Sequence, residues 1–207
     1  MGVAELTPAE RELTLAERES IPVQTATPES DAVPAAPVVD GERADLLGAL
    51  ANQRHLLRFT TRGLTDDQAR QRTTVSELCL GGLIKHVTAT ERGWVDFILE
   101  GPSAMGDFSA LTEEDLARRA DEFRLLPEET LEGVLAEYAE VARRTDALVI
   151  TLEDLSASHP LPSAPWFEDG ARWSARRALL HIAGETAQHA GHADIIREAL
   201  DGAKSMG

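Results

Sequence analysis

Apolar residues recur every three or four positions along four long segments of the chain. This spacing predicts amphipathic helices over residues 42–62, 76–100, 127–148 and 173–200. In the first segment, the apolar stripe consists of Leu46, Leu47, Leu50, Leu57 and Phe59. Each stripe must be buried against another element, so the pattern indicates helices that pack together.

The residues between the long segments indicate shorter or irregular elements. A short helix is predicted over residues 112–123, and the proline- and glycine-containing stretch 151–170 is interpreted as irregular. Ser76 is expected to cap the second long helix, and Gly101-Pro102 is expected to end it. No segment shows the alternation of apolar and polar residues that is typical of a half-buried strand. The sequence therefore predicts an all-α fold, a bundle of four long helices.

Residues 1–38 differ from the rest of the chain. They contain five of the ten prolines and no aromatic residue. A short helix is predicted from Pro8 to Glu19, because Thr7 suits the cap and proline suits the first helical position. The remainder has the composition of a linker. We therefore expect a partly flexible N-terminal extension over residues 1–38 and a helical domain over 39–207, and whether the extension docks on that domain stays open.

Charge and composition narrow the set of partners. The chain has 36 acidic and 20 basic residues, a formal net charge of −16 that would repel a nucleic acid backbone. It has no apolar run of about 18 residues and no basic start followed by an apolar stretch, so neither a membrane span nor a secretory signal is expected. Cys79 is the single cysteine and fits a reducing compartment. These features predict a cytoplasmic protein; its oligomeric state stays open, with a homodimer among the alternatives.

The last long segment carries a stripe of residues that can bind metal ions. His181, Glu185 and His189 follow one another at intervals of four, and His192 comes three residues later. In a helix these four positions fall within about 80° of one another, on the side that also carries apolar residues. A buried carboxylate is costly unless a cation or hydrogen bonds compensate it. The stripe therefore predicts either a metal site or a buried hydrogen-bond network.

A further histidine lies on the second long segment. His86 shares a helix face with Leu83, Trp94 and Phe97, so it is expected to point inward. If the two helices face each other, His86 can lie against Glu185 and His189. Imidazole and carboxylate groups suit zinc, nickel and ferrous iron, and three protein ligands leave a position open for water or substrate.

Two tryptophans are open candidates for lining a pocket. Trp166 lies in the irregular stretch and Trp173 lies just after it.

Two runs of residues resemble a known family. Residues 82–94, around His86, and residues 181–202, around Glu185 and His189, resemble the DinB-like superfamily and are closest to its actinobacterial branch of uncharacterised domains. Residues 63–70 fit the same branch, and the resemblance covers about residues 40–203. It implies a DinB-like four-helix bundle with a metal held by His86, Glu185 and His189, in which His192 replaces or assists one ligand.

The resemblance also implies a class of reaction. Glu followed by His four residues later is similar to the pattern of mycothiol-dependent maleylpyruvate isomerase. The implied function is a metal-dependent thiol transferase or isomerase that uses mycothiol, with zinc, nickel or iron as the metal and a small-molecule electrophile as the second substrate. An arginine near the pocket, for which Arg197 is one choice, would hold the thiol. The alternative is a non-catalytic metal-binding or stress-related helical binding module.

Overall fold

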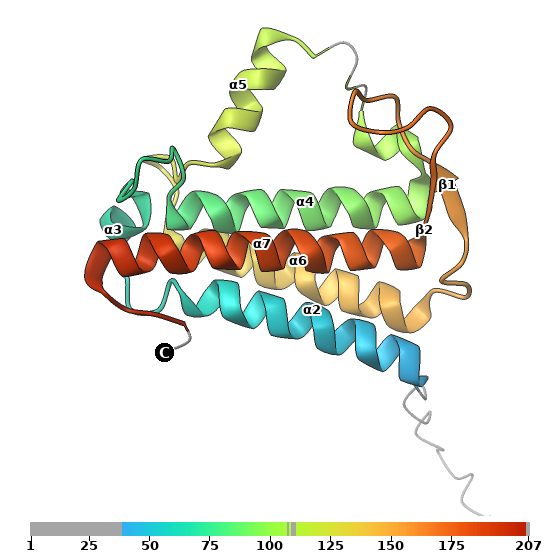
Figure 1. Ribbon diagram of the computed structural model, residues 1–207, viewed down its shortest axis with the longest axis horizontal. Helices are drawn as coiled ribbons and strands as arrows, with labels where there is room; N and C mark the ends of the chain where they lie inside the picture. The colour runs from blue at the N-terminus through green and yellow to red at the C-terminus, as the bar shows by residue number, and fades with distance from the viewer. Residues whose placement is uncertain (1–38, 107, 109–110, 206–207) are drawn as a thin grey trace, which may run out of the picture. The chain divides into compact units, whose positions relative to one another are not determined.

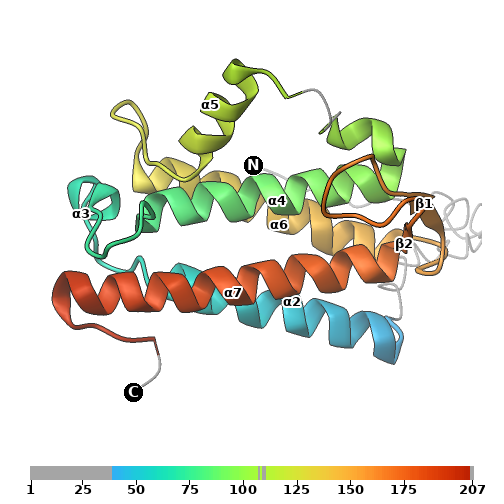
Figure 2. The same cartoon turned by 45° about the horizontal axis from the view of Figure 1, so that its top comes forward.

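Four long helices make up most of the chain that the computed structural model describes, which comprises residues 39–106, 108 and 111–205. They are α2 (Gly41–Phe59), α4 (Leu80–Glu100), α6 (Leu131–Thr151) and α7 (Ala175–Asp201). The four helices run alongside one another in both views (Figure 1, Figure 2). The predicted all-α four-helix bundle is confirmed. The extension over residues 1–38, with its predicted helix from Pro8 to Glu19, lies outside the described residues.

The helices pack through the apolar stripes that the sequence predicts. Helix α7 packs closely on α2 and α4, and α4 also packs closely on α6, whereas α2 and α6 meet less extensively. Leu50 of α2, Val95 of α4 and Leu179 of α7 are at most 1% exposed and lie in one cluster of the core. Fully burying a side chain of this size stabilises the folded state by about 1.5–3 kcal/mol. The contact between α4 and α7 brings the two predicted ligand-bearing helices together.

Helix α4 begins later than predicted. Cys79 is its N-cap and accepts a hydrogen bond at its Sγ from the Gly82 amide at 3.4 Å. The hydroxyl of Ser76 instead accepts a bond from the amide of Leu78, two residues on, at 3.2 Å. Ser76 therefore stabilises a local turn before the helix, and its predicted role as the cap is wrong.

Shorter elements surround the bundle. Helix α3 spans Asp66–Arg70, the 3₁₀ helix η1 spans Pro102–Met105, and α5 spans Glu113–Glu122, in agreement with the helix predicted there. Strands β1 (Ser158–Pro160) and β2 (Arg172–Ser174) form an antiparallel pair that the sequence did not predict. Three-residue strands are too short to show alternation. The pair holds the start of α7, because Trp173 and Ser174 lead directly into that helix.

Gly82 lets the segment after α5 cross α4 closely. A Cβ atom on Gly82 would lie 2.0 Å from the carbonyl oxygen of Phe123, a distance that no side chain allows. This close crossing brings the Phe123 ring onto the ring of His86, with centroids 4.1 Å apart. In Figure 2, α5 lies above α4, outside the bundle of the four long helices. The glycine therefore determines where α5 stands relative to His86.

A buried ion pair joins α2, α4 and α6. Glu91 of α4 is fully buried, and its carboxylate accepts hydrogen bonds from the guanidinium of Arg54 on α2 and from the hydroxyl of Thr145 on α6. Arg54 also donates to Asp146 of α6 at 2.7 Å. Burial alone would lower the pKa of Arg54, but the hydrogen bonds and charge of Glu91 raise it, so this cation stays charged. The pair fixes the rotation of α4 within the bundle.

We expect Gly82→Ala to destabilise the protein by about 3 kcal/mol, because the added methyl group collides with the Phe123 backbone. Urea unfolding followed by circular dichroism measures this. Gly48→Ala is the matched control: Gly48 is exposed in α2 and has open space around it, so alanine should stabilise by up to about 1 kcal/mol. Equal changes in the free energy of unfolding for the two variants would contradict the close crossing of the chain at Gly82.

We expect Glu91→Gln to lower the free energy of unfolding by about 3 kcal/mol, because it leaves Arg54 buried without its main partner. The same denaturation experiment measures it. Arg143→Gln removes one member of an exposed pair with Glu140, 71% and 64% exposed, and should cost less than about 1 kcal/mol. A loss in Glu91→Gln no larger than in this control would show that the buried pair does not fix the bundle.

Candidate metal centre

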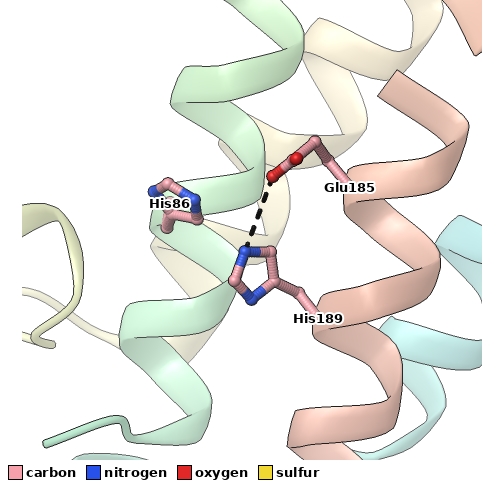
Figure 3. Close-up of side chains that lie close together, drawn as sticks. All are labelled: His86, Glu185 and His189. Atoms are coloured by element: carbon pink, nitrogen blue, oxygen red, sulfur yellow. Dashed lines mark ion pairs between the residues drawn. The ribbon is translucent and has the colours of Figure 1, made fainter. Parts of the chain in front are cut away.

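Three of the four predicted ligand residues meet between two helices. His86 comes from α4, and Glu185 and His189 come from α7, one turn apart (Figure 3). One ligand atom from each residue lies within 4.8 Å of the other two. The Nε2 atom of His189 lies 3.8 Å from Oε2 of Glu185, and the rings of His86 and His189 meet edge to face with centroids 4.8 Å apart. Two helices thus bring together three residues that could hold one metal ion.

The packing of the helices explains why these side chains converge. His189 is 8% exposed, and its neighbours Ala190 and Ala193 are buried in the core. Glu185 is one turn closer to the start of α7 and is half-buried, as is His86. The site therefore lies at the edge of the core, where one ligand is enclosed and the other two reach a cavity.

The residues present fit a divalent metal ion. The Nδ1 atom of His86 is buried and has no hydrogen-bond partner among the described residues; Oε2 of Glu122 is 3.7 Å away, too far for a hydrogen bond. An unpaired buried nitrogen costs about 1–3 kcal/mol, and no side chain among the described residues fixes the tautomer of this ring. Two imidazoles and a carboxylate are also a donor set that zinc accepts. Ligands about 2.1 Å from a tetrahedral ion lie about 3.4 Å apart, so small side-chain rotations would complete the site.

The protonation state of His189 favours metal binding. Burial, with smaller electrostatic contributions from the neighbouring His86 and His192, lowers the pKa of His189 to about 4. Its imidazole is therefore neutral at pH 7 and keeps a lone pair on one of its two ring nitrogens. A ligand histidine must be neutral in this way.

His192 lies beside the cluster and outside it. Its Nδ1 atom is 3.4 Å from Nδ1 of His189, whereas Glu185 faces the other nitrogen of that ring. A hydrogen bond at the second nitrogen of a ligand histidine fixes the orientation and tautomer of the ring. The geometry thus favours His192 as the partner that holds His189.

His181 contacts the cluster from the other end. Its Nε2 atom lies 3.8 Å from Oε1 of Glu185, and its ring packs edge to face on Trp94 and Trp173, with centroids 4.8 and 5.1 Å away. Burial lowers the pKa of His181, which leaves it neutral near pH 7. His181 therefore lies next to Glu185 on the predicted stripe, but it is not one of the three residues that converge.

A cavity of about 780 Å³ opens beside the cluster. His86 and Glu185 line it, so two of the three candidate ligands face open space. Its volume falls in the range of about 300–1,000 Å³ that is typical of small-molecule sites. Another hollow, of about 1030 Å³, lies between α2 and α6 and contains none of the converging residues. We therefore place the functional site at the smaller cavity.

The walls of this cavity were only partly predicted. Trp166, an open pocket candidate in the sequence, lines it. The charged side chains that α5 contributes were not singled out; they are Asp115, Arg118, Arg119 and Glu122. The sequence did not indicate this role, because most charged helix faces are simply exposed to solvent.

The suggestion that Arg197 holds a thiol is wrong. Arg197 is 7% exposed and donates to the carbonyl oxygens of Thr60 and Arg62 at 2.7 and 2.8 Å. It is absent from the lining of the cavity. The arginine ties the end of α7 to the loop after α2, which is a structural role.

Fold and site together define a helical-bundle protein with a candidate metal centre at the edge of a small-molecule cavity. A family model described as Mycothiol-S-transferase matches residues 45–202, more than half of the chain. The chain therefore belongs to the mycothiol S-transferase family, which confirms the predicted relationship to DinB-like, mycothiol-related proteins. The match supports mycothiol as the thiol and transfer as the reaction. No curated protein matches the chain.

No helix among the described residues is both long enough and apolar enough to cross a bilayer.

Proposed function

We propose that this protein is a metal-dependent mycothiol S-transferase that joins the sulfur of mycothiol to a small electrophile. The observation that carries the proposal is the convergence of His86, Glu185 and His189 at the edge of a cavity, in a chain of the mycothiol S-transferase family. We further propose that it works in the cytoplasm, where low-molecular-weight thiols are kept reduced. The transfer function is assigned to the domain of residues 39–207.

His86, Glu185 and His189 would hold the ion, with zinc as the first choice and nickel or iron as alternatives. Bound there, the metal would lower the pKa of a cofactor thiol so that the thiolate, the nucleophilic form, is present at neutral pH. Three protein ligands leave room for one more donor, which suits a thiol that binds and departs in each cycle.

The chain's own residues account for the rest of the site. His192 would hold the ring of His189 through its second nitrogen, and His181 would restrain Glu185 from the opposite side. Because His86 and Glu185 face the cavity, the sulfur of mycothiol would be presented to an electrophile lying in that cavity. In the transfer, a sulfur–carbon bond forms, the bond to the leaving group breaks, the leaving group departs with its electron pair, and the thiol proton goes to water.

Metal binding provides the first test. Protein loaded with zinc and desalted should retain about one equivalent, and zinc at 100 times its Kd should raise the free energy of unfolding by about 2.7 kcal/mol. His86→Ala and His189→Ala each remove one ligand and should retain less than about a tenth of an equivalent. Elemental analysis and thermal unfolding measure the two effects.

His55→Ala is the matched control for metal binding, because His55 is an exposed histidine on α2 outside the cluster. It should behave like the unaltered protein in both measurements. Zinc retention and stabilisation that persist in both His86→Ala and His189→Ala would rule out this cluster as the metal site.

Thiol transfer provides the second test. The zinc-loaded protein should consume mycothiol with monobromobimane, and His86→Ala should lower kcat/KM by at least about 100-fold, because one ligand of the thiol-activating metal is gone. Ile195→Ala, a change at a 62% exposed position of α7, should leave the rate unchanged. Full activity in His86→Ala would overturn the metal mechanism, and zinc binding without any thiol consumption would favour a non-catalytic metal-binding module.

A further inference from the structure

Aromatic residues are scarce in this chain, and its tryptophans lie at or beside the cavity. Phe, Trp and Tyr together make up 4% of the sequence, with three tryptophans. Trp94 and Trp166 line the cavity, and Trp173 stacks on Trp94 with ring centroids 4.6 Å apart. All three tryptophans therefore belong to one region, next to the candidate metal centre.

The rings form a continuous wall. Phe167 meets Trp94, Trp166 and Trp173 edge to face, with centroids 6.5, 6.1 and 5.8 Å away. At the inner end of the wall, Trp94 contacts His181, which in turn lies beside Glu185. The wall thus leads from the loop between β1 and β2 down to the residues that would hold the metal.

Trp166, at the outer end of the wall, is much more exposed than a side chain that serves only to pack the core. Trp94 is 5% exposed and belongs to the core, but Trp166 is 58% exposed on an irregular loop. Large exposed apolar groups commonly mark interaction sites. Because Trp166 also lines the cavity, its exposed face is available to a molecule that lies there.

The facing wall has the opposite chemistry. Helix α5 contributes Asp115, Arg118, Arg119 and Glu122 to the lining. Charged and hydrogen-bonding groups suit a polar molecule, whereas an aromatic wall suits a flat apolar one. One cavity therefore offers two distinct surfaces, one suited to a polar molecule and one suited to a flat apolar molecule.

We infer, building on the proposed transferase function, that Trp94, Trp166 and Phe167 form the electrophile subsite and that the electrophiles it accepts are planar aromatic compounds. A halogenated nitroarene is the simplest member of this class. Its ring stacks on the wall, the mycothiol sulfur forms a bond to the ring carbon, the carbon–halogen bond breaks, and the halide leaves with the bonding electron pair. The thiol proton passes to water. The polar mycothiol lies along α5.

A comparison of two electrophiles tests the subsite through catalysis. Trp166→Ala should lower kcat/KM for 1-chloro-2,4-dinitrobenzene about tenfold, the size expected for the loss of one aromatic contact, and should change the rate with aliphatic iodoacetamide less than about twofold. The KM for mycothiol should not change. Ile195→Ala, at a 62% exposed apolar position outside the cavity, is the matched control and should leave both rates unchanged. An equal loss with both electrophiles would overturn the inference.

Direct binding tests the subsite without turnover. Unreactive 1,3-dinitrobenzene should bind the full-length protein with a sub-millimolar Kd in equilibrium dialysis; Trp166→Ala should weaken binding about tenfold, and Trp166→Phe should retain most of it. Binding without thiol consumption would support the subsite and refute the transferase proposal. Thiol transfer to iodoacetamide without any binding of the arene would refute the subsite and leave the transferase proposal intact.

Discussion

The buried ion pair between Arg54 and Glu91 sets the orientation of α4, and the site depends on that orientation. Glu91 is fully buried and held by α2 and α6, so α4 cannot rotate without leaving a charge unpaired in the core. His86 precedes Glu91 by five residues, which places it about 140° around the helix. With Glu91 directed at α2 and α6, His86 is therefore directed at α7 and at Phe123.

Around this fixed helix, two further contacts complete the site. Gly82 allows the segment after α5 to cross α4 closely, which encloses His86 on one side with Phe123. The contact between α4 and α7 encloses it on the other side with His189. The side of the site that neither contact covers opens into the cavity, which has one charged wall and one aromatic wall. A rigid core thus carries the candidate ligands, while irregular segments and α5 provide the other walls of the cavity.

Helical periodicity was enough to predict the four long helices and the inward direction of His86, whereas its meeting with Glu185 and His189 depended on which helices pack together. Helical periodicity depends on the local spacing of apolar residues, which a long amphipathic segment shows directly.

The sequence did not predict features that depend on contacts between residues far apart in the chain. Pairing of β1 with β2 involves three residues on each side, too few to leave a pattern. Ser76 has the chemistry of a cap, and only the observed turn shows that Cys79 takes that place. The charged side chains of α5 line the cavity because the close crossing at Gly82 places α5 there. Arg197 donates to a backbone carbonyl oxygen far away in the sequence, which local spacing cannot reveal.

We propose that His86, Glu185 and His189 together hold one divalent metal ion. Anomalous diffraction at the zinc absorption edge, from crystals of the zinc-loaded protein, would locate that ion. We expect a single strong peak about 2.0–2.2 Å from one nitrogen of each histidine and one carboxylate oxygen, with His192 hydrogen-bonded to the far nitrogen of His189. A peak located elsewhere, or one that His192 coordinates in place of His189 or Glu185, would contradict it.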